Sequence, residues 1–278
     1  MLTNPDRVPV RVLTDPTWLR DSTRGTDLKT ARVVPFTVAK PAMTAQCELN
    51  LLGDFRLVVH GERVTVGPSA QRLLAVLVCL GRQAARTTIA HALWPDSPTA
   101  RAHANLRTTL YRLQRAWPDL VLSTKTDLRL SPTLRVDVES TRAMAISLLN
   151  TPPGEESALL DRLQWTNFAE DMLAGWDDEW LADHQLSYRR LRLDALERLS
   201  ALLVCREMHG AAIQAALAVI QADSLRDSAH EALIRVYLAQ GNRHDAMSHY
   251  RDYRLILRDE LGLEPPEALG RLLWQEAA

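Results

Sequence analysis

The sequence predicts a mainly α-helical chain with a small antiparallel β component. Three observations support this fold class. Short runs of Leu, Val and Phe, broken by glycine, follow Cys47 and are typical of small antiparallel strands. A helical pattern with one apolar stripe occupies residues 97–117, and an almost wholly helical pattern runs from Asp137 to the end. We therefore expect a head that mixes strands and helices, followed by an all-helical body.

The composition is ordinary for a soluble globular protein, with 46% hydrophobic and 24% charged residues, and 278 residues are enough for two domains. The cysteines, Cys47, Cys79 and Cys205, are odd in number and widely spaced, which argues against a disulfide framework or a zinc site. No apolar run approaches the roughly 18 residues of a membrane helix, and the N-terminus lacks the apolar core of a signal peptide. We expect a cytoplasmic protein with no membrane partner.

The formal net charge of −1 hides an asymmetry along the chain. Residues 46–136 contain 12 basic and 6 acidic groups, a net charge of +6, whereas residues 137–278 contain 14 and 24, a net charge of −10. A basic module followed by an acidic one suits a head that binds a polyanion and a body with another role.

Residues 1–45 mix Thr, Pro, Asp, Arg and Val without sustained periodicity, so we expect a flexible N-terminal extension rather than a third domain. Their net charge of +3, from 7 basic and 4 acidic groups, could add affinity for phosphates. Met43 is a second candidate for the translation start, because folded patterning begins directly after it.

The head begins with a predicted antiparallel sheet over residues 47–66, broken at Gly53 and Gly61. The next segment, SAQRLLAVLVCLG, has a broad apolar face and ends at Gly81, as expected for a core helix. A short helix then starts at Thr87 or Thr88 and is ended by Pro95.

The helix predicted over residues 97–117 has two contrasting faces. Ser97 is the expected N-cap and Pro98 suits the first helical position. Four residues form the stripe expected in the core: Leu106, Leu110, Leu113 and Trp117. The opposite face has no acidic residue and contains Arg101, Ala104, Asn105, Thr108, Tyr111, Arg112 and Arg115. Such a helix can lie in a DNA major groove, but a solvated surface helix gives the same pattern, so its context must decide.

That context is a hairpin. Two short β runs, Val121–Ser123 and Leu128–Leu130, flank a turn over residues 124–127. Strands, three helices and a hairpin in this order predict a winged helix-turn-helix, a DNA-binding domain over residues 46–136.

The body, residues 137–278, is predicted to be a tetratricopeptide-like all-α domain. Helices are expected at 138–149 and 158–168, and a long one at 186–210. Two similar units follow, with Gly210 and Gly241 aligned at a spacing of 31, close to the tetratricopeptide period of about 34. Ala215 and Ala246 are then the small residues that let helices approach, and three tyrosines are expected in the packing: Tyr237, Tyr250 and Tyr253.

With these elements in place, the chain resembles the Streptomyces antibiotic regulatory protein family of transcriptional activators, in its short form, from about Glu48 to Glu267. The head resembles an OmpR/PhoB-type winged helix through LNLLGDFRLVVHGERVTVGPSAQRLLAVLVCLG, HALWPDSP and LRTTLYRLQRAW. The body is similar to the bacterial transcriptional activator domain through MLAGWDDEWL, RLRLDALERLSALL, the segment Asp223–Arg226 and EALIRVYLAQGNRHDAMSHYRDYRLILRDELGLEPP. The end of that stretch, DELGLEPP, is the most specific piece.

The sequence departs from the family pattern in three places. The wing turn has no glycine where family members often have a Gly-rich tip, and Asp127 adds a negative charge there, which weakens the case for Lys125 as a phosphate contact. Ser224 stands where a proline after Asp is usual. The nucleotide-binding motif GxxxxGK[ST] of the large members does not occur, so control by ATP in cis is not expected.

The expected function is sequence-specific binding of double-stranded DNA and activation of transcription. From Arg101 to Arg112 the helix rises roughly 16 Å, enough for one pass through a major groove. Arg can bond guanine and Asn can bond adenine in that groove, so the predicted base-reading residues are Arg101, Asn105, Thr108 and Arg112. The predicted phosphate contacts are Arg107, Tyr111, Arg115 and Lys125, although Tyr111 could instead read bases or pack.

The resemblance further implies contact with RNA polymerase, through its sigma factor or alpha subunit, and self-association on direct DNA repeats. The promoters would be those of a biosynthetic gene cluster for a secondary metabolite. Two alternatives stay open: a ligand-responsive repressor or regulator, and a helical protein-interaction scaffold. No HExxH, GxSxG, GxGxxG or paired-Cys pattern is present, so no enzyme activity, catalytic residue, cofactor or metal is expected.

Overall fold

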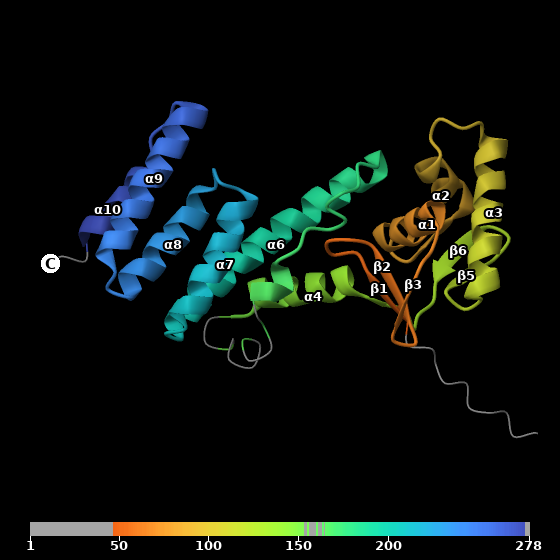
Figure 1. Ribbon diagram of the computed structural model, residues 1–278, viewed down its shortest axis with the longest axis horizontal. Coiled ribbons are helices and arrows are strands. Elements are labelled where there is room, and N and C mark those ends of the chain that lie inside the picture. Colours follow the sequence, from red (N-terminus) through yellow and green to blue (C-terminus); the bar gives the residue numbers. More distant parts are fainter. Residues whose placement is uncertain (1–46, 153–154, 156–159, 161–162, 164, 276–278) are drawn as a thin grey trace, which may run out of the picture. The chain divides into compact units, whose positions relative to one another are not determined.

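The computed structural model describes residues 47–152, 155, 160, 163 and 165–275, all within one structural unit, Met43–Ala278 (Figure 1). The predicted extension over residues 1–45, the second start at Met43 and most of the predicted helix at 158–168 lie outside the described residues. The last four residues of that helix, Trp165–Phe168, form a short 3₁₀ helix, η1.

The strands of the head form two small sheets. The first has the order β3-β2-β1-β7 and consists of β1 (Cys47–Asn50), β2 (Arg56–Val59), β3 (Glu62–Val64) and β7 (Arg135–Val136). The second has the order β4-β6-β5 and consists of β4 (Gln83–Ala85), β5 (Val121–Ser123) and β6 (Asp127–Leu130). The predicted antiparallel strands and hairpin are confirmed, but β7 pairs with β1 in parallel, and neither β7 nor β4 was predicted. Strand β7 has only two residues, and β4 has three residues of which two are alanines, so neither carries enough β pattern to be recognised.

Three helices complete the head at the predicted places: α1 (Pro68–Cys79), α2 (Arg86–Leu93) and α3 (Thr99–Ala116). The prediction that Ser97 caps α3 is wrong, because the residue at the N-cap position is Pro98 and no side chain caps the helix. The Ser97 N–H donates to the Trp94 carbonyl oxygen at 3.2 Å in a turn, which keeps Ser97 outside the helix.

The apolar stripe of α3 lies in the core as predicted. Leu106, Leu110 and Leu113 are at most 5% exposed, and Trp117 is partly buried against the same cluster. That cluster also contains Leu73, Leu74 and Leu77 of α1, so α3 packs on α1 through its apolar face and leaves its opposite face to solvent. Substitutions on the buried face of α3 should therefore lower the free energy of unfolding more than substitutions on its exposed face.

The body is helical, with described helices α4 (Asp137–Asn150), α6 (Glu179–Cys205), α7 (His209–Ala222), α8 (Asp227–Ala239), α9 (Arg243–Leu261) and α10 (Glu267–Gln275). From α6 to α9 each helix packs on the next, as in a tetratricopeptide array (Figure 1). Ala215 and Ala246 are fully buried, as the repeat predicted. The long helix begins at Glu179, earlier than predicted, and Gly210 lies inside α7 whereas Gly241 makes the turn before α9 with φ of 74°.

A histidine pair joins α8 to α9. The His230 Nε2–H donates to the Ser224 carbonyl oxygen at 3.0 Å, and in the neutral imidazole its Nδ1 then accepts from His249 Nε2 at 2.9 Å. Tyr253 is fully buried and stacks on His230 with ring centroids 3.6 Å apart, while Tyr237 and Tyr250 are partly buried in the same cluster. The three tyrosines therefore pack as predicted.

Leu113→Ala should reduce the free energy of unfolding by about 2–5 kcal/mol, because it leaves a cavity behind α3. Urea denaturation followed by circular dichroism measures the loss. Tyr111→Ala is the matched control, since this side chain on the same helix is 66% exposed and should change stability by no more than about 0.5 kcal/mol. An equal loss of unfolding free energy in the two variants would contradict packing of α3 through its leucine face.

Stability should also fall in acid because of the histidine pair. Burial lowers the pKa of His230, and burial together with the neighbouring His230 lowers the pKa of His249 to about 4. Below about pH 6.5 the two histidines take up protons in the unfolded chain, while in the folded protein they stay neutral. The contribution of the pair to the free energy of unfolding is therefore complete above about pH 6.5 and is lost as the pH falls towards 4. Replacing His249 by Gln should flatten the decline between pH 6.5 and 4 by about 1–2 kcal/mol. Thermal melts across that range test this, with exposed His91→Gln expected to leave the decline unchanged.

Candidate nucleic-acid interface

The exposed side of α3 carries the four predicted base-reading residues in one stripe. At about 100° per residue they fall within one narrow sector of the helix, opposite Leu106. Arg101, Thr108 and Arg112 are exposed and Asn105 is half-buried. Arg115 continues this stripe into the last turn of the helix. The structure thus brings these predicted residues together on one surface.

Thr108 has a restricted role on that stripe. Its hydroxyl donates to the Ala104 carbonyl oxygen of its own helix at 3.0 Å. The oxygen lone pairs remain, so Thr108 can accept from a donor in the groove but has no second proton to give.

A second stripe runs beside the first and faces the wing. It contains Arg107 and Tyr111, both exposed. A recess here is lined by residues from the start of α2, from α3 and from the wing turn: Ala85, Arg86, Thr87, His103, Leu106, Arg107, Lys125 and Thr126. The predicted phosphate contacts Arg107 and Lys125 therefore lie around one recess whose described lining has no carboxylate. Tyr111 and Arg115 do not line it.

Arg86 is a functional candidate that sequence reasoning missed. Its backbone N–H donates to the Thr126 carbonyl oxygen at 2.8 Å, and its Nε donates to the Thr124 carbonyl oxygen at 3.0 Å. It therefore fixes the wing turn against α2 and adds a positive charge to the recess. The available signal was a basic residue directly before Thr87 at a predicted helix start.

The wing turn is held without glycine. The Thr124 hydroxyl oxygen accepts from the Asp127 N–H at 2.9 Å and from the Thr126 N–H at 3.3 Å. Thr126 in turn donates its hydroxyl to the Asp127 carboxylate. Asp127 is half-buried at the start of β6, whereas Lys125 is exposed. Although it lacks a glycine-rich tip, the wing turn is therefore fixed by side-chain hydrogen bonds, and Lys125 is exposed to solvent.

Charge and anchoring both suit this surface to a polyanion. Among the residues that the structure describes, no ion pair involves Arg101, Arg107 or Arg112. Gln114 Nε2 donates to the Val121 carbonyl oxygen at 2.8 Å and ties α3 to the wing. The α3 guanidinium groups are therefore available to a ligand and stand on an anchored helix.

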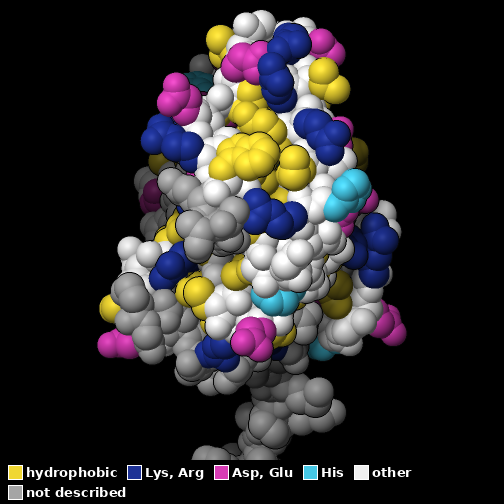
Figure 2. Space-filling view, turned by 90° about the vertical axis from the view of Figure 1, so that its left-hand side faces the viewer, with side chains coloured by type: hydrophobic (Ala, Val, Ile, Leu, Met, Phe, Trp, Pro, Cys, Tyr) yellow, Lys and Arg dark blue, Asp and Glu magenta, His cyan; other side chains and the backbone are white. Residues whose placement is uncertain are grey.

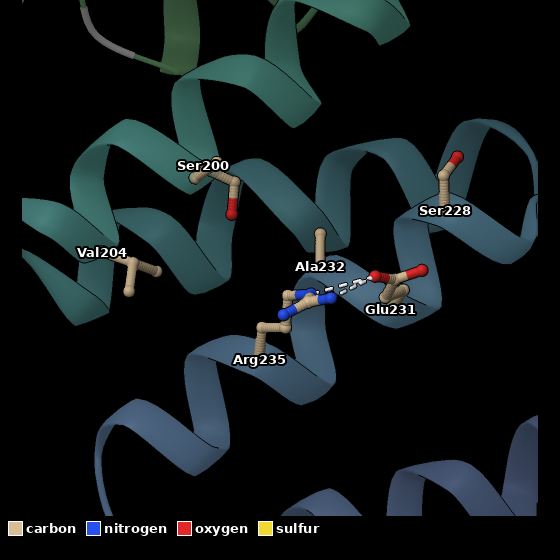
Figure 3. Close-up of a pocket in the computed structure, with 7 residues that line it drawn as sticks. Ser200, Val204, Ser228, Glu231, Ala232 and Arg235 are labelled. Carbon is tan, nitrogen blue, oxygen red and sulfur yellow. Dashed lines mark hydrogen bonds and ion pairs between the residues drawn. The ribbon is translucent and has the colours of Figure 1, made fainter. Parts of the chain in front are cut away.

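A groove of about 300 Å³ lies between α6 and α8 (Figure 3). Its lining consists of Ser200, Ala201, Val204, Ser228, Glu231, Ala232 and Arg235. Arg235 is paired with Glu231 at 2.7 Å, and the Ser200 hydroxyl donates to the Ala212 carbonyl oxygen at 2.9 Å. The Ser228 hydroxyl donates to the Glu197 carboxylate at 2.8 Å, so the polar groups in the groove are largely engaged with the protein itself.

Apolar side chains gather on the face that α9 and α10 present at the left of Figure 1 (Figure 2). The exposed large apolar residues of these helices and the following turn include Leu255, Leu261, Leu263 and Trp274, of which Trp274 is 68% exposed. Glu264 pairs there with Arg254 and Arg258, and these two arginines lower the pKa of its carboxyl to about 2. An apolar face with engaged charges is typical of a protein contact rather than a DNA contact.

The residues that the structure describes contain no group of three or more His, Cys, Asp or Glu side chains suited to a metal ion. They also contain no helix with both the length and the apolar character needed to cross a membrane. Burial raises the pKa of the Cys79 thiol to about 12, so this thiol is a packing group rather than a nucleophile.

Comparisons with known proteins agree with this architecture. The family model of the bacterial transcriptional activator domain matches residues 165–275. The regulatory protein AfsR of Streptomyces griseus is 26% identical over an alignment of 258 residues, which covers 85% of this chain and 25% of AfsR. AfsR of Streptomyces coelicolor is 27% identical over 234 residues, 80% of this chain and 23% of the relative. The chain spans about a quarter of the length of these relatives.

A solved structure shares the fold. EmbR of Mycobacterium tuberculosis, in complex with a low affinity phosphopeptide, matches with a TM-score of 0.66 and 20% identity, over 84% of this chain and 66% of that chain. The helical body carries the activator domain and the head carries the winged helix, in the order that the sequence predicted. The activator-domain match and the two AfsR relatives support a regulator of the Streptomyces antibiotic regulatory protein type.

Proposed function

We propose that this protein binds double-stranded DNA sequence-specifically through α3 and activates transcription in the cytoplasm. The observation that carries the proposal is the acid-free, exposed face of α3, backed by a buried leucine stripe and flanked by a cationic recess. A helix that is anchored behind and carries Arg, Asn and Thr in front meets the requirements of major-groove readout. The activator domain over residues 165–275 supports activation rather than repression.

The two stripes of α3 have different roles in this proposal: one reads bases, and the other binds phosphate together with the wing. Arg101, Asn105, Thr108 and Arg112 read base edges, with Thr108 acting as an acceptor. Arg107, Lys125 and the newly found Arg86 surround the recess beside the wing and bind backbone phosphate. Tyr111 and Arg115 add phosphate contacts towards the end of the helix.

The body contributes the protein partners. Its net charge of −10 over residues 137–278 suits contact with basic surfaces of RNA polymerase, through the sigma factor or the alpha subunit. The apolar α9–α10 face suits self-association of two copies on direct repeats. The relatives are named as regulatory proteins, which supports a regulatory role. The proposed targets are promoters of a biosynthetic gene cluster. No catalytic role is proposed.

A footprint across the promoters of the neighbouring gene cluster, with and without polymerase, tests this function. Protection of a tandem repeat that extends when polymerase is added is the expected result. Protection that polymerase does not extend would favour a repressor. Absence of salt-sensitive DNA binding would favour the protein-interaction scaffold.

Arg112→Ala should lower the ratio of cognate to random DNA affinity by about 10–100-fold, because one bidentate base contact provides roughly 1–3 kcal/mol of discrimination. Fluorescence anisotropy on the two duplexes measures the ratio. Lys125→Ala is the matched control: one lost phosphate contact should weaken both duplexes about equally and lower the salt slope by about 1. An equal loss on both duplexes for Arg112→Ala would remove this residue from the base readers.

Trp274→Ala should reduce cooperative binding to a two-repeat duplex about tenfold and leave binding to a single repeat unchanged, because it removes an exposed aromatic from the α9–α10 face. Gel-shift titrations on one- and two-repeat duplexes measure both quantities. Met208→Ala removes another exposed apolar side chain, 53% exposed, from the turn before α7 and should change neither. Unchanged cooperativity in Trp274→Ala would exclude this face from self-association.

A ligand-responsive regulator is the second candidate, and the α6–α8 groove is the observation that favours it. Its volume is at the lower end of the range for small-molecule sites. A metabolite of the cluster that raises the melting temperature, and fails to do so in Ala232→Trp, would support this candidate.

A further inference from the structure

The end of β1 is bound by residues of the helical body. The Leu173 N–H donates to the Leu51 carbonyl oxygen at 2.8 Å, and the Gly53 N–H donates to the Asp171 carbonyl oxygen at 2.8 Å. Leu52 and Met172 lie opposite each other between these bonds as an antiparallel bridge. The body therefore continues the pairing of a strand that belongs to the DNA-binding head.

A second element of the body holds the same backbone from another direction. The Asp137 carboxylate, at the start of α4, accepts from the Leu51 N–H at 2.8 Å and from the Leu52 N–H at 3.0 Å. The backbone N–H groups of Leu51 and Leu52 are thus satisfied by the body.

The body also fills the core of the winged helix. Its residues in that core are at most 6% exposed and are Val138, Met172, Leu173, Leu181 and Tyr188. The three buried leucines of α3 belong to the same cluster. Because packed interiors transmit small displacements, the position of α3 depends on these side chains.

An ion pair joins the two parts at the surface of this core. Arg72 Nε, on α1, donates to the two carboxylate oxygens of Asp178 at 2.7 and 3.1 Å. The Arg72 guanidinium lies 5.3 Å from the ring centroid of Trp176, which stacks on Phe55 at 6.2 Å. Residues of the head thus contact both Trp176 and Asp178 in the turn that precedes α6.

Two side chains of α6 hold the junction segment, which we define as residues 168–176. Arg192 is 3% exposed and donates to the Phe168 carbonyl oxygen at 2.9 Å and to the Asp171 carboxylate at 2.7 Å. Gln185 Nε2 donates to the carbonyl oxygens of Met172, at 3.1 Å, and Leu173, at 3.0 Å. The junction segment is therefore fixed to α6 on one side and to the sheet of the head on the other.

We propose that the winged helix and the junction segment form one cooperative unit, in which Arg192 and Gln185 act as positioning residues for α3. Neither residue is part of the candidate DNA surface. They act through the junction segment on β1 and on the shared core, so a displacement of α6 changes the orientation of α3. The DNA arm of the test rests on the proposed function, and the exchange arm does not.

The first arm measures amide hydrogen exchange on the free, full-length chain. Arg192→Met should accelerate exchange about tenfold both in the junction segment and in peptides covering Leu51–Gly53 and α1, because β1 loses its held partner. Gln185→Ala should accelerate exchange in the same peptides by a smaller factor, about threefold. If Arg192→Met does not fold, Gln185→Ala tests the coupling instead. Faster exchange confined to residues 165–205, with β1 and α1 at their original rates, would overturn the proposal.

Arg226→Met is the matched control. Arg226 also pairs with carboxylates of α6, Asp194 and Glu197, but it stands at the start of α8. Its replacement should accelerate exchange at the start of α8 and leave β1 and α1 unchanged. Acceleration in β1 by this control as well would overturn the specific role of the junction.

The second arm measures DNA affinity for cognate and random duplexes. Arg192→Met should lower the ratio of the two affinities by at least about fivefold, because base contacts depend on the placement of α3. An unchanged ratio would overturn the positioning role. Failure of the original protein to bind either duplex would contradict the proposed function, and the exchange arm would still decide the coupling.

Discussion

The buried guanidinium of Arg192 is the interaction on which the arrangement of head and body depends. A charge that is 3% exposed is costly unless it is paired and hydrogen-bonded. Here the Asp171 carboxylate and the carbonyl oxygens of Phe168 and Ala169 accept from the two terminal guanidinium nitrogens, while the buried Nε has no partner among the described residues. Removing one partner of such a pair costs about 3–5 kcal/mol, because the other charge stays buried. This penalty restricts the junction segment to one conformation. Since that segment also pairs with β1, the conformation is passed to the sheet of the head.

The second constraint is that α3 serves two purposes. Its leucine stripe is packed into the shared core and its opposite face carries the candidate base-reading residues. A side chain on a rigid helix is placed by the packing of the other face, so the proposed base readout and the stability of the head would be coupled in this element. Gln114 and Arg86 fix the wing to the same scaffold. Its turn is held by hydrogen bonds and is less flexible than a glycine tip would be. Under the proposed function, affinity for phosphate and readout of bases would thus depend on one rigid support.

The sequence allowed prediction of the elements that have a local pattern, and it missed those that depend on distant partners. The α3 stripe, the hairpin and the buried alanines were predictable, because periodicity and turn residues lie within a few positions of one another. Strand β4, strand β7 and the partner of Arg72, 106 positions away, depend on tertiary pairing that no local pattern carries. The domain boundary at 136/137 stays a prediction. A linear boundary does not describe a core to which Leu173 and Leu181 contribute. The roles of the eight predicted site residues also stay predictions, although most are now placed on one exposed surface.

Helix α6 connects the two candidate regulatory features of the body. Arg192, which holds the junction, and Ser200, which lines the α6–α8 groove, lie on this helix about 12 Å apart along its axis. An α-helix transmits displacement along its axis better than a loop does, because each backbone hydrogen bond constrains the next turn. A ligand or partner that enters the groove would therefore act on the same helix that holds β1 and the shared core. It would need to favour one orientation of α6 over another to have any effect, since a ligand shifts an equilibrium only by its difference in affinity for the two states. Regulation through the body requires no contact with α3 under this arrangement.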